Sequence, residues 1–517
     1  MQSYLLFLAV TNFFRNFAQN IHIQSQKQQY KMFTFLISLV LLICGYFVYG
    51  RFVERIFSPD AERITPAIEK ADGVDYIVLP GWKIFMIQFL NIAGTGPIFG
   101  AIMGAKFGPV AYLWIVLGCI FAGATHDYLS GMLSMRNKGA GLPELVGKYL
   151  GNGVKKIMLV FTVLLLILVG AVFVKSPADI LTSMFGNGLL WIILIFTYYV
   201  IATMLPVDKI IGKIYPLFAF SLLFMAAALM VVLFIRWYDL PELWDAGFTN
   251  LGNSLHPDTF TDDIFPCLFI TIACGAISGF HATQSPLMAR CIKNEKMGRP
   301  IFYGSMITEG IVALIWATVA AYFFYGKPEA GCDIMEGANG FATGAPVVVN
   351  LVCNNWLGIA GGILAMLGVV AAPITSGDTA LRSARLIIAE WLGAEQKTIA
   401  KRLMISIPLF LITIAVLVWQ MENSEGFGVI WGYFGWANQT LAVFTLWTLT
   451  VYLAKEKKCY LITLIPALLM TAVCSAYIIV AKNALGMPPY IGYGVATLLC
   501  IVFLALFIKY LNKLNEK

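Results

Sequence analysis

The chain interrupts one of its apolar runs at Gly94-Thr95-Gly96-Pro97, inside the stretch QFLNIAGTGPIFGAIMGAK (residues 88–106). The run covers residues 83–105 and is long enough to cross a bilayer as a helix. Proline removes a backbone hydrogen bond from such a helix. Hydrocarbon cannot satisfy the freed groups, so the break must line a cavity or be buried in protein. Glycines also permit close helix packing, but the proline favours a cavity-lining break.

A second interruption lies in the apolar run of residues 264–283, which contains Gly275-Ala276-Ile277-Ser278-Gly279 and then His281. Without a central proline, this pattern alone fits close helix packing and a cavity-lining break equally well. Two interrupted helices at corresponding positions are, however, the best sequence indication of a transporter's binding site near the middle of the membrane.

The composition of the whole chain indicates a polytopic helical membrane protein. Of its 517 residues, 59% are hydrophobic and 12% are charged, whereas a typical soluble domain is about 25% charged. A soluble enzyme, a nucleic-acid-binding protein and a disordered chain are therefore excluded. An outer-membrane barrel is excluded because its strands alternate apolar and polar residues. Apolar windows predict thirteen spans, at residues 33–50, 83–105, 109–131, 154–174, 188–205, 214–236, 264–283, 302–325, 357–375, 403–420, 428–453, 459–481 and 488–510.

Charged loops orient these spans. Loops rich in Lys and Arg, such as residues 136–156 and 455–458, alternate with acidic loops, such as residues 239–263. Basic loops face the cytoplasm by the positive-inside rule. The C-terminus is therefore expected in the cytoplasm, and the two interrupted spans are expected to start from opposite sides of the membrane.

The interrupted spans open two consecutive blocks of five spans, residues 83–236 and 264–453. Blocks of odd span number that start from opposite sides are what an inverted repeat requires. The expected fold is therefore all-α, with about thirteen transmembrane helices and a five-plus-five inverted-repeat core. We expect three further segments: an N-terminal appendage at 1–31, a peripheral helix and cytoplasmic loop at 32–82, and a C-terminal helix pair at 454–517.

Three long motifs resemble those of the carbon starvation protein A (CstA) family. They are QFLNIAGTGPIFGAIMGAKFGPVAYLWIVLGCIFAGATHDYLSGMLSMR (Gln88–Arg136), FPCLFITIACGAISGFHATQSPLMAR (Phe265–Arg290) and APITSGDTALRSARLIIAE (Ala372–Glu390). The resemblance covers roughly residues 32–510. It implies a transporter of the bacterial inner membrane, linked to peptide uptake during carbon starvation and, in some members, to proton-coupled pyruvate uptake.

The resemblance also places the chain in the amino acid–polyamine–organocation superfamily, whose core is a five-plus-five inverted repeat. In that superfamily a hydroxyl pair on the eighth core helix completes a sodium site. Counting from residue 83, Thr375 and Ser376 take that position and are candidates for Na⁺ binding. Helix packing or capping is an equal alternative for both hydroxyls. Asp378 is expected to add charge there or to pair with Arg382 four residues on.

The candidate solute-binding residues surround the two interruptions. Unwound backbone offers N–H groups to a carboxylate and C=O groups to a cation. The candidates are Gln88, Asn91, Gly94, Thr95 and Gly96 at the first interruption, and Ser278, His281 and Gln284 at the second. Gln88 could instead bond to a neighbouring helix, and His281 could bridge two helices instead of carrying a proton.

Two buried carboxyl groups are candidates for cation coupling. Asp127 lies in span 109–131, and Glu309 lies well inside span 302–325. An intramembrane carboxyl group is costly unless it is neutral or paired. Asp127 is expected either to accept a proton or to pair with Arg136 or another loop base, with the pairing slightly favoured.

These observations favour a secondary active symporter for small carboxylates or short peptides, coupled to H⁺ or Na⁺. The expected partners are the solute, the coupling ion and the lipid bilayer, with no nucleic acid and no cofactor; the oligomeric state is left open. A membrane-embedded enzyme is disfavoured because the chain has no HExxH, GxSxG or Walker motif. A passive channel is the other alternative.

Overall fold

The computed structural model describes residues 32–72, 76–204, 211–245, 248, 250, 262–325, 340–394, 399–423 and 426–516. These residues form helices and no strand, which confirms the all-α fold class. The expected appendage at 1–31 lies outside the described residues.

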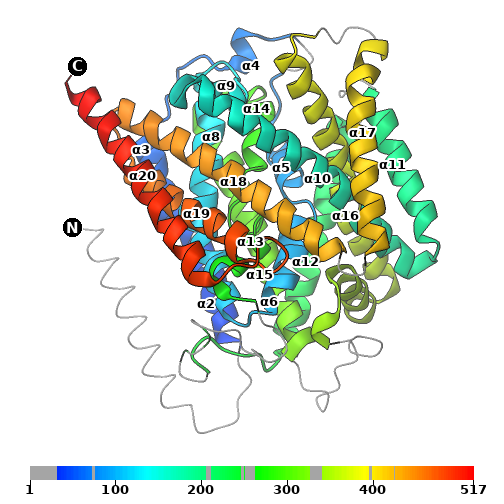
Figure 1. Cartoon of the computed structure of the whole chain (residues 1–517). Helices are drawn as coiled ribbons and strands as arrows, with labels where there is room; N and C mark the ends of the chain where they lie inside the picture. Colours follow the sequence, from blue (N-terminus) through cyan, green and yellow to red (C-terminus); the bar gives the residue numbers. More distant parts are fainter. Residues whose placement is uncertain are drawn as a thin grey trace.

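The helices follow one another through the bundle shown in Figure 1. Their bounds are α2 Phe33–Phe47, α3 Tyr49–Phe57, α4 Pro66–Glu69, α5 Gly81–Ile92, α6 Gly96–Ala105, α7 Val110–Leu113, η1 Trp114–Gly123, α8 Ala124–Arg136, α9 Leu142–Leu150, α10 Asn152–Phe185, α11 Gly188–Met204, α12 Ile211–Arg236, η4 Ile264–Leu268, α13 Phe269–Thr271, α14 His281–Ala289, η5 Glu295–Met297, η6 Arg299–Tyr303, α15 Gly304–Tyr325, η8 Gly340–Ala342, α16 Ala345–Trp391, α17 Ile399–Glu422, α18 Gly426–Lys455, α19 Leu461–Val480 and α20 Pro489–Asn515.

Each of the thirteen predicted spans coincides with a helix or with a series of helices. In the described part of the chain, eight helices are long and apolar enough to cross a membrane. The pair α5 and α6 adds a ninth span that is bent by 49° at its break. The exact count of thirteen spans and the inverted repeat stay predictions.

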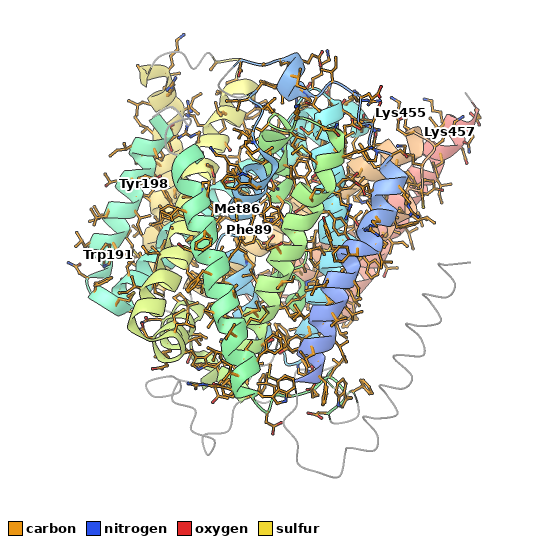
Figure 2. The ribbon with its side chains drawn as sticks, turned by 180° about the vertical axis from the view of Figure 1, so that it is seen from behind. Met86, Phe89, Trp191, Tyr198, Lys455 and Lys457 are labelled. Atoms are coloured by element: carbon orange, nitrogen blue, oxygen red, sulfur yellow. The ribbon has the colours of Figure 1, made fainter. Side chains whose placement is uncertain are left out.

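The helices on either side of the two interruptions, α5 and α6 and then α13 and α14, lie in the middle of the bundle. α6 packs against α15, α8 packs against α14, and α18 packs against α8 and α13. Seen from behind, Phe89 of α5 lies inside the bundle, whereas Trp191 and Tyr198 lie on the peripheral helix α11 (Figure 2). The broken helices are therefore shielded from lipid by their neighbours.

One end of the bundle carries a cluster of basic residues (Figure 2). α4, α9 and the C-terminal end of α20 lie together at this end (Figure 1), as do Lys455 and Lys457 (Figure 2). An ion pair ties the end together: the Arg136 guanidinium at the end of α8 donates to both carboxylate oxygens of the buried Glu295, each at 3.1 Å. The positive-inside rule would place this end in the cytoplasm.

Candidate functional site

The first break lies between α5 and α6. Helix α5 ends at Ile92, Ala93 leaves the helical conformation, and α6 starts at Gly96 with Pro97 in its first turn. Proline is well suited to a first turn because its missing N–H would be unpaired there anyway. The sequence GTGP therefore both ends one helix and starts the next.

The second break lies between α13 and α14. Helix α13 ends at Thr271, residues 272–280 are not helical, and α14 starts at His281. The predicted interruption Gly275–Gly279 falls inside this non-helical segment. The second break is therefore longer than the first, and it delivers His281 to the first position of a helix.

The two breaks touch each other. A Cβ atom at Gly96 would collide with the side chain of Cys274, and a Cβ atom at Gly100 would lie 2.8 Å from the Thr271 carbonyl oxygen. Only glycine permits backbones to approach this closely. Both glycines therefore serve to bring α6 against the second break.

Side chains from neighbouring helices satisfy backbone groups that the second break sets free. The indole N–H of Trp114 donates to the Ile272 carbonyl at 2.9 Å. The Asn438 amide oxygen on α18 accepts the Phe280 N–H at 2.7 Å and the Ser278 hydroxyl at 3.1 Å. The predicted site residue Ser278 is thus fixed against α18 by hydrogen bonding.

Four fully buried titratable side chains form a chain beside the second break. Asp127 Oδ1 lies 2.7 Å from His126 Nδ1, and Asp127 Oδ2 lies 2.8 Å from His281 Nδ1. The other ring nitrogen of His281, Nε2, lies 3.4 Å from Glu309 Oε2. All four side chains have no exposed surface. The chain joins α8, α14 and α15, and no described Lys or Arg forms an ion pair with either carboxyl group.

The favoured pairing of Asp127 with Arg136 or another loop base is wrong. Arg136 binds Glu295, whereas Asp127 binds the two histidines. Helix geometry explains the difference. Asp127 and Arg136 are nine residues apart, which in an α-helix corresponds to a rise of about 13 Å and a rotation of about two and a half turns. Arg136 therefore lies on the opposite face of α8, at its end.

Four further predicted site residues have buried polar atoms without a hydrogen-bond partner. The amide of Gln88, the hydroxyl of Thr95, the hydroxyl of Ser376 and the amide oxygen of Gln284 have no hydrogen-bond partner in the structure. A buried polar atom without a partner is costly. These atoms are therefore available to a solute or an ion.

Ser376 on α16 faces the first break. A Cβ atom at Gly94 would lie 3.6 Å from Ser376 Oγ and 3.2 Å from the Phe173 ring. The hydroxyl of the adjacent Thr375 donates to the Ala372 carbonyl at 2.8 Å. The structure thus places the Ser376 hydroxyl next to the first break, whereas the Thr375 hydroxyl binds a carbonyl of its own helix. Asn91 is buried on α5 just before the break.

Asp378 lies one turn further along α16 and is paired. Its carboxylate accepts the Tyr198 hydroxyl at 3.3 Å and lies 3.5 Å from Arg382. The i,i+4 partner considered from the sequence is therefore present.

One group of side chains in the described part of the chain could hold a metal ion. The ligand atoms of Cys274, His281 and Glu309 lie within 4.8 Å of one another. A tetrahedral zinc site needs metal–ligand bonds of about 2.0–2.3 Å. Ligand atoms separated by distances near 4.8 Å are too far apart to form such bonds to one ion. The hydrogen bond between His281 and Asp127 instead suits proton sharing, with Glu309 Oε2 3.4 Å from His281 Nε2 but not hydrogen-bonded to it.

The sequence reasoning missed Asn438, Trp114 and His126. Asn438 had a visible signal, because the polar pair Asn438-Gln439 interrupts the apolar span 428–453. Trp114 had none, because a tryptophan in an apolar run is ordinarily a packing residue. His126 was visible as the neighbour of Asp127 in the HD pair, but its role depends on the Asp127 carboxylate.

Comparison with known proteins agrees with this architecture. The family model described as carbon starvation protein CstA matches residues 30–186, 174–330 and 327–481. An uncharacterised membrane protein of Haemophilus influenzae is 45% identical over 358 residues, which cover 59% of this chain and 96% of that protein.

Two more distant relatives have named functions. The peptide transporter CstA of Bacillus subtilis is 26% identical and aligns over 91% of this chain and 94% of its own length. The pyruvate/proton symporter BtsT of Escherichia coli is 26% identical, and the match covers 57% of this chain and 51% of that protein.

Among solved structures, a manganese transporter of Eremococcus coleocola has a similar fold. The TM-score is 0.54 at 12% identity, and the match covers 86% of this chain and 98% of that chain. At this identity the likeness concerns the fold alone. The named relatives are transporters and not enzymes, and the chain is a multi-pass membrane protein that belongs to the carbon starvation protein CstA family of transporters.

Proposed function

We propose that this protein is a proton-coupled symporter that imports a small carboxylate such as pyruvate, or a short peptide, across the bacterial inner membrane. The observation that carries the proposal is the buried chain of His126, Asp127, His281 and Glu309 at the start of α14. The C-terminus lies in the cytoplasm in this proposal, because the basic end of the bundle faces inward.

The chain is suited to holding one proton. With a proton on His281, the imidazolium lies between the carboxylates of Asp127 and Glu309. Without that proton, two carboxylates are buried together with no cation between them, which is strongly unfavourable in a medium of low dielectric constant. Within the described part of the chain, Cys119 and Cys274 are further titratable groups close to these carboxyl groups.

The position of His281 links the proton to the solute. His281 is the first residue of α14, directly after the second break. A movement of α14 that accompanies solute binding changes the His281 distances to Asp127 on α8 and to Glu309 on α15. Solute binding and proton affinity are coupled in this way.

The solute is proposed to bind at the touching breaks. No Lys or Arg occurs in residues 84–105 or 264–289, so a carboxylate there depends on backbone N–H groups, on helix dipoles and on the accompanying proton. The unpaired groups of Gln88, Thr95 and Ser376 supply further hydrogen bonds. Na⁺ binding at Thr375 and Ser376 is the alternative coupling.

Uptake by purified protein in proteoliposomes tests the proposal. Radiolabelled pyruvate, lactate, alanine and dipeptides are offered separately, with an inward proton gradient and with or without Na⁺. We expect concentrative uptake that a protonophore abolishes and that Na⁺ does not change. Uptake that requires Na⁺ would replace proton coupling by sodium coupling, and uptake that never exceeds equilibrium would indicate a channel.

A further inference from the structure

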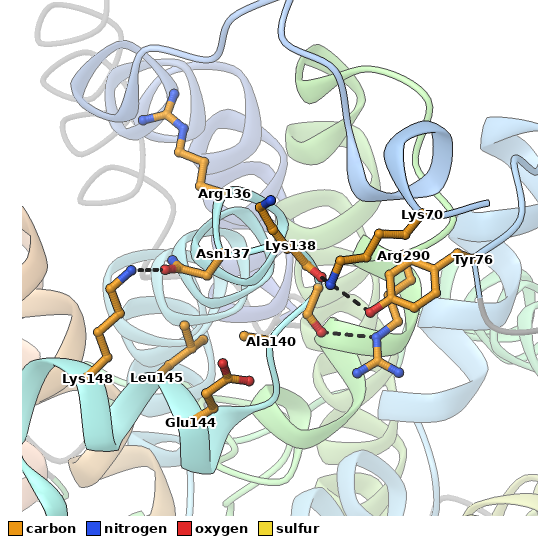
Figure 3. A pocket seen from close by; sticks show the side chains of 11 residues that line it. Lys70, Tyr76, Arg136, Asn137, Lys138, Ala140, Glu144, Leu145, Lys148 and Arg290 are labelled. Atoms are coloured by element: carbon orange, nitrogen blue, oxygen red, sulfur yellow. Dashed lines mark hydrogen bonds between the residues drawn. The ribbon is translucent and has the colours of Figure 1, made fainter. Parts of the chain in front are cut away.

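A cavity of about 380 Å³ opens at the basic end of the bundle (Figure 3). It lies between the segment after α4, the loop from α8 to α9, and the end of α14. The cavity is within the range of about 300–1,000 Å³ in which small-molecule sites are usually found. Its lining residues are Lys70, Tyr76, Arg136, Asn137, Lys138, Gly139, Ala140, Glu144, Leu145, Lys148 and Arg290.

The lining is strongly cationic. Five Lys or Arg residues and one carboxylate, Glu144, surround the cavity. Two of the five cations are already paired, because Arg136 binds Glu295 and Lys138 lies 2.9 Å from Glu69. Within the described part of the chain, Lys70, Lys148 and Arg290 form no ion pair with a carboxylate, so the lining keeps a net positive charge.

Backbone carbonyls hold two of these cations in place. Lys70 Nζ donates to the Lys138 carbonyl at 3.2 Å, and Arg290 Nε donates to the Gly139 carbonyl at 3.0 Å. The Tyr76 hydroxyl also donates to the Lys138 carbonyl, at 3.3 Å. Lys148 binds the Asn137 side chain. These positions are therefore fixed without neutralising the charges.

Two of the cations share one aromatic ring. Lys70 Nζ lies 5.4 Å from the centre of the Tyr76 ring, and the Arg290 guanidinium carbon lies 5.3 Å from it. Two like charges gathered around one ring repel each other unless an anion lies between them. The Asp72 carboxylate accepts the Tyr76 N–H at 2.9 Å and so fixes the turn that carries the ring.

We propose that this cavity binds a phosphate-bearing anion at the basic end of the bundle, contacted by Lys70, Lys148 and Arg290. Guanidinium groups suit phosphate because they present parallel donors to its oxygens. Arg290 follows α14, and Gly139 follows α8, so the anion would tie together the ends of the two helices that carry His281 and Asp127. The proposal is independent of the transported solute.

Equilibrium binding to the full-length protein in nanodiscs of phosphatidylcholine tests the site. Inorganic pyrophosphate is the soluble probe, and its binding is measured by titration calorimetry at low and at high salt concentration. We expect saturable binding that weakens with salt, and a dissociation constant at least tenfold higher in Lys70→Gln and in Arg290→Gln. Lys513→Gln is the matched control, because this exposed lysine lies on α20, outside the cavity lining.

A second arm identifies the source of the phosphate. Nanodiscs that contain phosphatidic acid are compared with phosphatidylcholine nanodiscs for their effect on pyrophosphate affinity. Competition by phosphatidic acid that is lost in Lys70→Gln supports a lipid headgroup as the occupant, and unchanged affinity supports a soluble phosphorylated molecule. Pyrophosphate binding that is absent, or equally tight in wild type and in the Lys70→Gln/Lys148→Gln double variant, would overturn the proposal. Both lysines are exposed, so folding is not at stake in that variant.

Discussion

The Nδ1 atom of His281 lies 2.8 Å from the Oδ2 atom of Asp127, although 154 positions separate the two residues in the sequence. Both side chains are completely buried. The contact joins α8 to the first residue after the second break. A change in the position or charge of either side chain is therefore transmitted to the other helix.

Asp127→Asn tests this contact. Asparagine keeps the shape of the side chain but removes the charge that stabilises a protonated His281. We expect uptake driven by a proton gradient to fall at least tenfold in proteoliposomes, while solute exchange without a gradient persists. The exposed Asp239 provides the control as Asp239→Asn. Gradient-driven uptake at the wild-type rate would remove Asp127 from the proposed proton chain.

Glu309→Gln tests the other end of the chain. The variant removes one of the two carboxylates around His281, so proton release no longer leaves two buried charges unpaired. We expect uptake in wild type to rise as the external pH falls from 8 to 6, and uptake in the variant to become nearly independent of pH. Glu422→Gln, at an exposed position, should retain the wild-type pH profile. A similar pH profile in Glu309→Gln would contradict the assignment.

The charge balance of transport is also testable. One proton carried with one monocarboxylate moves no net charge across the membrane. A proton gradient should therefore drive pyruvate uptake, whereas a potassium diffusion potential set with valinomycin should not change its rate. A clear response to the imposed potential would require a different stoichiometry or a different ion.

Gly94→Leu tests the first break. A Cβ atom there already approaches the Phe173 ring to 3.2 Å and Ser376 to 3.6 Å, so a leucine side chain fills the space at the first break that we propose for the solute. We expect uptake to drop to the level of empty liposomes while membrane insertion and the elution profile stay normal. Gly153→Leu is the matched control, because a Cβ atom at Gly153 meets nothing within 4 Å. Normal uptake by Gly94→Leu would place the solute elsewhere.

Ser376→Ala removes a buried hydroxyl that has no partner in the structure. A hydrogen bond to the solute is worth about 1 kcal/mol, which corresponds to a rise in KM of roughly fivefold at unchanged maximal rate. Initial uptake rates over a range of solute concentrations measure this. A lower sodium affinity in the same variant, together with sodium-dependent uptake, would instead favour the Na⁺ site.

Glu295→Ala concerns stability and not transport. Glu295 is buried and binds the Arg136 guanidinium as well as the Asp60 N–H. Removal of one partner of a buried ion pair costs about 3–5 kcal/mol, so a lower melting temperature is expected in detergent. Glu62→Ala, which alters an exposed side chain nearby, should leave the melting temperature unchanged.

Local features of the fold were accessible from the sequence, because they depend on short stretches of residues. Apolar length predicts a span, and GTGP predicts a helix end followed by a helix start, as the bounds of α5 and α6 confirm. The contact of Asp127 with His281 was not accessible, because 154 positions separate the two residues and Arg136, the nearest Lys or Arg in the sequence, lies on the opposite face of α8. Which side chain approaches from a distant helix depends on packing that no local pattern encodes.

The same limit applies to the groups that hold the breaks. The glycine pattern of the second break fits helix packing and a cavity-lining break equally well. The structure shows that Asn438 and Trp114 bind the exposed backbone there. The solute-site roles of Gln88, Asn91, Thr95 and Gln284 stay predictions, since position and burial alone do not establish a role in binding.

The Asn438 amide has a consequence for the energetics of the cycle. Because it accepts hydrogen bonds from both Ser278 and Phe280, the non-helical segment 272–280 is held in place before the solute binds. Solute binding therefore does not have to unwind a helix there. Preorganisation of this kind saves the cost of ordering or disordering backbone at the moment of association. In the proposed symporter, the free energy of solute binding is then not offset by the ordering of this segment.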